Sequence, residues 1–162
     1  SDVCSSDLAG MLEVGKQKIQ EKNLSNTIEM VLADSENMPF ENHFFDAITV
    51  AFGVRNFENL EKGLAEILRV LKPNGVFVIL ETSVPDKTPY KQGYTFYSKK
   101  ILPLIGKLFS NDNVAYGYLS ESAAAFPYGE ALNNILRKIG FIDVVAMPQT
   151  FGVATIYSAT KK

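Results

Sequence analysis

Apolar positions along the chain change their spacing several times, and each change predicts a different element. Nearly continuous apolar runs at residues 28–33, 45–52 and 76–80 are typical of strands covered by helices on both faces of a parallel sheet. Apolar residues three and four positions apart predict amphipathic helices from Ala9 to about residue 20, from Leu60 to about residue 71, and over 128–139. This alternation of helix and strand predicts an α/β fold with a mostly parallel sheet.

Two later segments depart from that alternation. Residues 141–147 and 152–160 have strand-like patterns and are joined by a short connection with Pro148-Gln149-Thr150, which predicts an antiparallel hairpin at the edge of the sheet. Residues 84–120 contain many aromatic and aliphatic side chains from Tyr90 to Phe109, with Lys91, Lys99, Lys100 and Lys107 between them. This segment is interpreted as a helical, lid-like insertion.

Polar clusters follow three of the predicted strands: Asp34 to Glu36, Gly53 to Asn56, and Glu81 to Ser83. Crossover connections between parallel strands are right-handed, so the carboxyl ends of the strands lie at one edge of the sheet. Ligands of open α/β sheets bind along that edge. The pattern therefore predicts that the three clusters converge on one binding site.

Composition narrows the possible functions. The chain has 162 residues, 46% of them hydrophobic, which fits one soluble globular domain. A net charge of -2 argues against nucleic-acid binding. Cys4 is the only cysteine, which excludes a cysteine-based zinc site, and no metal is expected. No apolar run approaches the ~20 residues of a membrane span, so a cytoplasmic protein is the default expectation.

The amino-terminal region lacks a feature that nucleotide-binding folds usually have. A doubly wound domain opens with a strand and a glycine-rich loop, but no Gly-x-Gly occurs in this chain. The segment from Ser1 to Asp7 is polar and shows no strand-like pattern. We therefore expect an amino-terminally truncated domain in which the first strand and its glycine-rich loop are missing.

Two stretches carry a resemblance to a known family. Phe52-Gly53-Val54-Arg55-Asn56-Phe57, and the run from Arg69 through Pro73-Asn74-Gly75 to Ser83, resemble the ubiquinone/menaquinone biosynthesis C-methyltransferases. Asn74 departs from the glycine that is usual there. The resemblance implies a class I S-adenosylmethionine-dependent methyltransferase (Rossmann-like) fold. It covers residues 9–162 as a partial domain, and leaves 1–8 as a junction segment outside the family.

The resemblance also implies residue roles. Asp34, with the Ser35 backbone, matches the position that holds the adenine of S-adenosylmethionine, and Ala51 matches a second cofactor-binding position. Arg55 and Asn56 match the catalytic positions at which the methyl group meets the substrate ring. Asp7 precedes Met11 by one residue too few to match the ribose-binding acid, so that role is not assigned to it.

The implied activity is S-adenosylmethionine-dependent C-methylation of the ring of demethylmenaquinol, or of the related benzoquinol. A prenylated substrate implies peripheral contact with the inner face of the membrane, and a homo-oligomer is compatible with the sequence. The alternatives are another small-molecule or lipid methyltransferase and an inactive binding fragment. The absence of a dinucleotide fingerprint disfavours a dehydrogenase.

Each candidate residue also has a purely structural interpretation. Asp34 is a common type of turn residue after a strand, and Arg55 taken alone is better explained as a surface salt-bridge partner. Glu81 is equally compatible with a buried structural carboxylate and with a site residue. For the aromatic residues from Tyr90 to Phe109, core packing and a substrate pocket are about equally supported interpretations.

Overall fold

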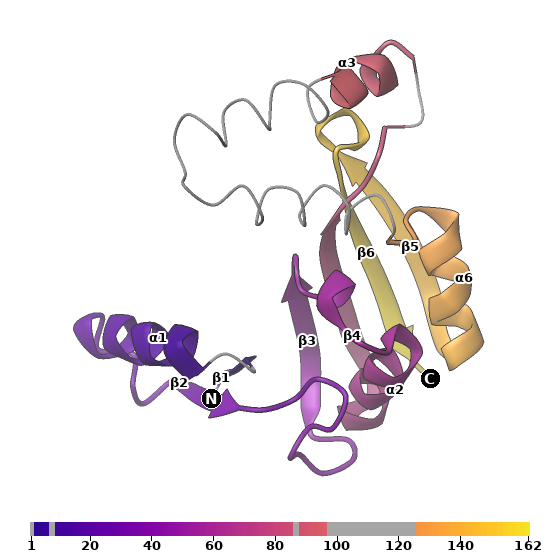
Figure 1. Ribbon diagram of the computed structural model, residues 1–162. Helices are drawn as coiled ribbons and strands as arrows, with labels where there is room; N and C mark the ends of the chain where they lie inside the picture. The colour runs from indigo at the N-terminus through magenta and orange to yellow at the C-terminus, as the bar shows by residue number, and fades with distance from the viewer. Residues whose placement is uncertain (1, 7–8, 86–87, 97–125) are drawn as a thin grey trace.

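The computed structural model describes residues 2–6, 9–85, 88–96 and 126–162. Within them the strands form two sheets (Figure 1), one with the order β1-β2 and a four-stranded one with the order β3-β4-β6-β5. The strands are β1 (Asp2–Ser6), β2 (Ile28–Leu32), β3 (Phe45–Ala51), β4 (Leu71–Thr82), β5 (Phe141–Gln149) and β6 (Ala154–Lys161).

The smaller sheet belongs to an amino-terminal unit. Strand β1 pairs in parallel with β2, and helix α1 (Ala9–Glu21) connects the two. The helix packs closely on β2, since a Cβ on Gly15 would lie 2.5 Å from Cε of Met30. The expectation that residues 1–8 contain no strand is wrong for Asp2–Ser6: pairing with β2 outweighs their weak local preference. Their assignment to a segment outside the family stays a prediction.

The four-stranded sheet is mixed. Strands β3 and β4 are parallel, whereas β6 is antiparallel to both of its neighbours, β4 and β5. The predicted C-terminal hairpin at the sheet edge is therefore confirmed. The expectation of a mostly parallel sheet is wrong for these four strands, because the hairpin supplies two of the three strand pairs.

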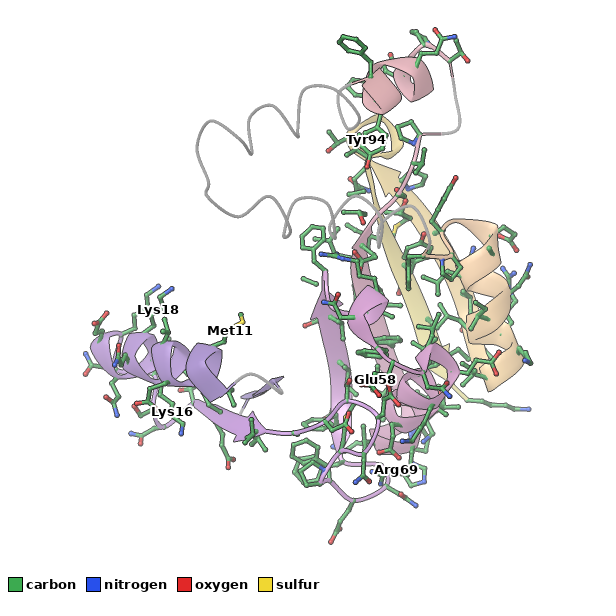
Figure 2. All side chains as sticks on the ribbon, viewed as in Figure 1. Met11, Lys16, Lys18, Glu58, Arg69 and Tyr94 are labelled. Carbon is green, nitrogen blue, oxygen red and sulfur yellow. The ribbon has the colours of Figure 1, made fainter. Side chains whose placement is uncertain are left out.

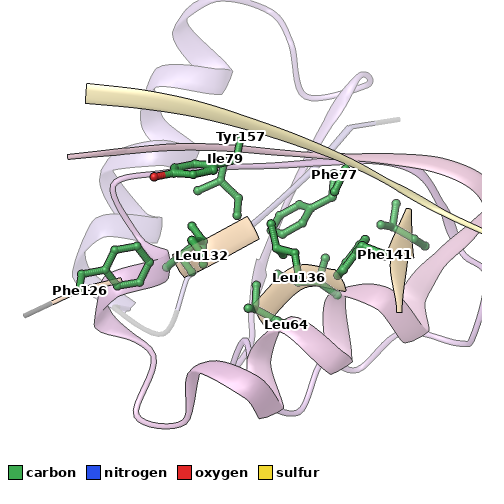
Figure 3. Packing of buried hydrophobic residues seen from close by; sticks show 12 residues of the cluster. Leu64, Phe77, Ile79, Phe126, Leu132, Leu136, Phe141 and Tyr157 are labelled. Atoms are coloured by element: carbon green, nitrogen blue, oxygen red, sulfur yellow. The ribbon is translucent and has the colours of Figure 1, made fainter. Parts of the chain in front are cut away.

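Two helices cover one face of this sheet, α2 (Leu60–Val70) and α6 (Glu130–Ile139). Their apolar stripes pack on β4 and β6 (Figure 3) in a core that contains Leu64, Phe77, Ile79, Leu132, Leu136, Phe141 and Tyr157. Side chains of β4 alternate between this core and the opposite face, where Val76 keeps 37% exposure. The expectation of helices on both faces is wrong for the described part of this sheet.

Hydrogen bonds near both ends of helix α2 fix its position. The Asn59 side chain accepts a hydrogen bond from the Lys62 backbone N–H at 3.0 Å and so caps the first turn. Near its last turn, Arg69 donates to the carbonyls of Met38 and Phe40 and thereby fixes the loop before β3 (Figure 2). The helix ends at Val70, and β4 begins at the next residue, earlier than the apolar run alone predicts.

The insertion begins with a short helix, α3 (Tyr90–Phe96). The part of the predicted insertion at 97–120, with Lys99, Lys100 and Lys107, lies outside the described residues. The hairpin of β5 and β6 is joined by the 3-10 helix η3 (Thr150–Gly152), which lies near α3 at one end of the molecule (Figure 1).

Candidate functional site

The segment after β3 leaves the sheet with an unusual backbone. Ala51 ends the strand and is exposed, and the Phe52 N–H still donates to the Leu80 carbonyl of β4 at 2.8 Å. Phe52 then adopts φ 54°, a left-handed conformation that is costly for a large non-glycine residue. This turn directs the chain into the 3-10 helix η1 (Val54–Asn56), which contains Arg55.

Arg55 and Glu81 join the ends of the two parallel strands. The Arg55 Nη1 atom lies 2.5 Å from Oε1 of Glu81. Glu81 is the next-to-last residue of β4. The Glu81 side chain is fully buried, and that of Arg55 is 11% exposed. The Arg55 guanidinium also lies 6.0 Å from the centre of the Phe52 ring, within cation–π distance.

The ion pair uses only part of the hydrogen-bonding capacity of its members. Oε1 of Glu81 accepts from both Arg55 and the Thr82 backbone N–H, the latter at 2.9 Å. Among the described residues, Oε2 of Glu81 and Nε of Arg55 are buried without a hydrogen-bond partner. Buried polar atoms are nearly always paired, so these two atoms are exceptions within the described part of the chain.

The polar turn after β2 contacts the start of α2, a few residues after Arg55 and Asn56 in the chain. Oδ1 of Asp34 accepts from the Glu36 backbone N–H at 2.8 Å, which gives the turn its shape. The Glu36 carboxylate in turn accepts from the Asn59 N–H at 2.7 Å, at the start of α2. The turn containing Asp34 and Ser35 is thereby attached to the segment that follows Asn56.

The predicted site residues thus fall into two groups. Ala51, Arg55 and Asn56 lie within six consecutive residues at the end of β3, and Arg55 contacts the third polar cluster through Glu81. Asp34 and Ser35 lie on the separate turn, which is connected through Glu36. The close pairing of Glu81 with Arg55 is the feature that sequence reasoning left undecided.

Comparison with solved structures defines the class of fold. A S-adenosylmethionine-dependent methyltransferase from Aquifex aeolicus matches 99% of this chain with a TM-score of 0.66 at 18% identity, over 68% of its own length. Phosphoethanolamine N-methyltransferase 2 of Haemonchus contortus, in complex with S-adenosyl-L-methionine, matches 98% with a TM-score of 0.69 at 14% identity, over 43% of its length. The chain therefore has the class I methyltransferase fold.

Sequence comparison places the chain within that class. Residues 2–161 match the ubiE/COQ5 methyltransferase family, and the chain belongs to it. The demethylmenaquinone methyltransferase of Bacteroides fragilis is 49% identical over 152 residues, 94% of this chain and 62% of that protein. The ubiquinone/menaquinone biosynthesis C-methyltransferase UbiE of Geobacter sulfurreducens is 43% identical, covering 94% and 59%. The chain thus spans about three fifths of the length of these relatives.

Proposed function

We propose that the protein transfers a methyl group from S-adenosylmethionine to a ring carbon of demethylmenaquinol or of the related benzoquinol. The names of its relatives suggest the substrate. The observation that carries the proposal is the Arg55–Glu81 pair at the strand ends, with a buried, unpartnered nitrogen on Arg55 among the described residues.

The residues of the Asp34 turn and of the β3 end fit part of the methyl donor. Asp34 is exposed at the end of a strand, and its carboxylate is held by the Glu36 N–H, so it can accept hydrogen bonds from an amino or hydroxyl group. Ala51 is a small exposed residue that allows a bound molecule to approach the end of β3. We assign Asp34 and Ser35 to the adenosine end and Ala51 to the neighbouring part of the site.

The chemistry requires a more electron-rich ring. S-adenosylmethionine supplies an electrophilic methyl group on a sulfonium, and an aromatic carbon attacks it readily only when an adjacent hydroxyl loses its proton. As the new carbon–carbon bond would form, the methyl–sulfur bond would break, S-adenosylhomocysteine would leave, and the attacked ring carbon would lose its hydrogen as a proton to restore the aromatic ring. Arg55 stays protonated, so its guanidinium stabilises the resulting phenolate or orients a water that takes the proton. Glu81 accepts from Nη1 of Arg55, and the part of the Arg55 side chain that stays exposed, 11% of it, is what remains for this contact.

Asn56 and Glu81 have supporting roles in this proposal. Asn56 follows Arg55 in η1 and is exposed, so its amide can bond a ring oxygen or the donor. Glu81 is a positioning residue: it is fully buried and sets the direction of the Arg55 side chain. The positive charge of Arg55 is then presented from a fixed position, which reduces reorganisation during the reaction.

Incubation of the protein with S-adenosylmethionine and demethylmenaquinol tests the proposal, with the product measured by mass spectrometry. Formation of the ring-methylated quinol supports it. Donor binding without methylation of demethylmenaquinol, or of the related benzoquinol in a parallel incubation, contradicts it and favours a methyltransferase for another small molecule or lipid. Failure to bind the donor in calorimetric titration favours an inactive binding fragment.

We also propose peripheral contact with the inner face of the cytoplasmic membrane, where a prenylated quinol would be found. No helix in the described ranges is long and apolar enough to span a bilayer. Exposed apolar side chains occur at the α3–η3 end of the molecule, on Tyr90, Phe96 and Phe151. Sedimentation with anionic vesicles measures this contact, and absence of binding would contradict it.

A further inference from the structure

The loop that joins β2 to β3 contains the turn to which the adenosine end of the donor is assigned. Within this turn the Asp34 carboxylate accepts from the Glu36 N–H, and the Asn37 N–H donates to the Asp34 carbonyl at 3.1 Å. An isolated antiparallel bridge between Asp34 and Asn37 closes the turn. These contacts fix the shape of the turn, but contacts within a turn cannot fix where it lies relative to the rest of the site.

Contacts with helix α2 determine that position. In the second half of the helix, Glu66 accepts from the Met38 N–H at 3.1 Å, and Arg69 donates to the Met38 carbonyl at 3.1 Å. At the start of the helix, Oε1 of Glu36 accepts from the Asn59 N–H at 2.7 Å. The loop is therefore attached to α2 at the capping residue and again along the second half of the helix.

The contact of Glu36 supplies an acceptor that the start of α2 lacks. In a capping box, the capping side chain accepts from the N–H three positions later, and a glutamate or glutamine at that later position accepts from the N–H of the capping residue. Asn59 makes the first of these bonds, with the Lys62 N–H. A lysine side chain has no acceptor, so the second bond comes from Glu36, 23 positions earlier in the chain. The same bond thus completes the helix start and places the donor turn.

The surroundings of the Glu36 carboxylate favour a fixed position. Its side chain is 11% exposed, and a carboxylate that is so largely covered requires partners for its oxygens. The start of a helix carries a partial positive charge that attracts an acidic side chain. Nζ of Lys62 lies 3.7 Å from Oε2, but at 58% exposure this lysine forms a weak ion pair. The main anchor of Glu36 is therefore the backbone of Asn59.

The anchored helix start lies close in sequence to the proposed reaction centre. Asn59 is three residues after Asn56, the last residue of η1. A donor whose adenosine end contacts the Asp34 turn and whose methyl group lies near Arg55 touches both segments. Such a donor binds most tightly when the two segments are held in place before it arrives, because less ordering is then left to the binding step.

We propose that Glu36 is a positioning residue for the methyl donor, a proposal that rests on the proposed function. Its carboxylate holds the turn of Asp34 and Ser35 in place against the segment that follows β3, and it acts through this turn without contacting the donor. When the carboxylate is removed, the turn keeps its shape and loses its fixed position, so the donor has to order it on binding. Donor affinity then falls, whereas the methyl-transfer step is unchanged once the donor is bound.

Three single variants separate this role from others. Glu36→Ala removes the acceptor and leaves the Glu36 N–H that shapes the turn. Glu36→Gln keeps an oxygen in the same place, which can still accept from Asn59. Glu58→Ala is the matched control, because Glu58 (labelled in Figure 2) is an exposed carboxylate immediately before Asn59. Calorimetric titration with S-adenosylmethionine compares donor affinities, and hydrogen exchange of the Asn59 amide, followed by NMR in donor-free protein, reports the bond itself.

Glu36→Ala is expected to weaken donor binding about fivefold, the effect of one hydrogen bond, with Glu36→Gln and Glu58→Ala within about twofold of the unaltered protein. The Asn59 amide is expected to exchange faster in Glu36→Ala than in the other three proteins. Equal donor affinity in Glu36→Ala and Glu58→Ala, no rescue by Glu36→Gln, or equal exchange of the Asn59 amide in all four proteins would each overturn the proposal.

Coupling and kinetics complete the test. Asp34→Ala combined with Glu36→Ala should weaken donor binding by less than the product of the two single losses, because Glu36 acts through the turn that carries Asp34. In turnover, Glu36→Ala should raise KM for S-adenosylmethionine about fivefold and leave kcat unchanged. Losses that multiply, or a fall in kcat with KM unchanged, would refute the role of Glu36 while the proposed function stands. Absence of methylation by the unaltered protein refutes the proposed function instead, and the donor role of Glu36 with it.

Discussion

Replacing Glu81 by glutamine removes one charge of the buried pair while keeping its shape. Breaking a buried ion pair from one side costs ~3–5 kcal/mol, because the remaining charge is left uncompensated. Two features reduce the cost: the Arg55 side chain keeps 11% exposure, and the glutamine oxygen can still accept from Arg55 and the Thr82 N–H. We therefore expect Glu81→Gln to lower the free energy of unfolding by about 1–3 kcal/mol.

Urea unfolding of four proteins measures this effect and the coupling behind it: the unaltered chain, Glu81→Gln, Arg55→Met and the double variant. Loss of both partners leaves no unpaired charge, so the double variant is expected to lose about 1–3 kcal/mol less than the sum of the single variants. At about 2–4 °C of Tm for each kcal/mol, the single change is also visible in thermal unfolding.

The exposed pair of Lys138 and Glu61 provides the control. Its side chains are 69% and 56% exposed, with a separation of 2.8 Å between Nζ and Oε1, so Glu61→Gln should leave the unfolding free energy unchanged within error. If the Glu81 and Arg55 variants were additive within about 0.5 kcal/mol, the two side chains would be energetically independent. The inference that Glu81 positions Arg55 would then be wrong.

Three further changes test other parts of the structure. Hydrogen bonds from Arg69 lower the pKa of Glu66, so its contribution to stability is complete above the ordinary glutamate pKa and is lost as pH falls through the lowered value; Glu66→Gln should flatten that part of a pH–stability profile. Gly63→Ala places a Cβ 2.4 Å from Cδ2 of Phe57 and should cost about 1–3 kcal/mol in urea unfolding. Asp34→Ala should weaken S-adenosylmethionine binding about tenfold in calorimetry.

Each of these three has an outcome that would contradict its reasoning. If Glu66→Gln left the low-pH part of the pH–stability profile unaltered, the pairing of Glu66 with Arg69 would have no effect on the free energy of unfolding. Gly10→Ala is the matched control for Gly63→Ala, and equal effects would show that packing on Phe57 is unimportant. Glu29→Ala, an exposed change on β2, controls for Asp34→Ala, and equal donor affinity in both variants would remove Asp34 from the site.

Apolar spacing alone predicted most of the elements. The apolar runs at 45–52 and 76–80 became the parallel pair β3 and β4, and the strands on either side of the short link after Met147 became the antiparallel hairpin. These predictions hold because a buried sheet face or helix stripe requires apolar residues at a regular spacing, which is visible in the local sequence. Strand β1 lacks such a pattern, and its structure depends on pairing with β2.

The side-chain arrangement at the site could be predicted only in part. The pattern indicated that residues near Arg55 and Glu81 would share a sheet edge, but their direct contact depends on strand register and on the turn at Phe52. No glycine at position 150 or 151 signals the left-handed backbone of η3. Local strain of this kind is imposed by tertiary contacts, and the sequence does not show it.

The most direct test of the central claim is the turnover of demethylmenaquinol with S-adenosylmethionine by the unaltered protein and by Arg55→Ala. If Arg55 stabilises the developing phenolate, methylated product forms with the unaltered protein and kcat falls by about 100-fold or more in the variant. Normal turnover by Arg55→Ala would contradict the assignment of the reaction centre to the end of β3.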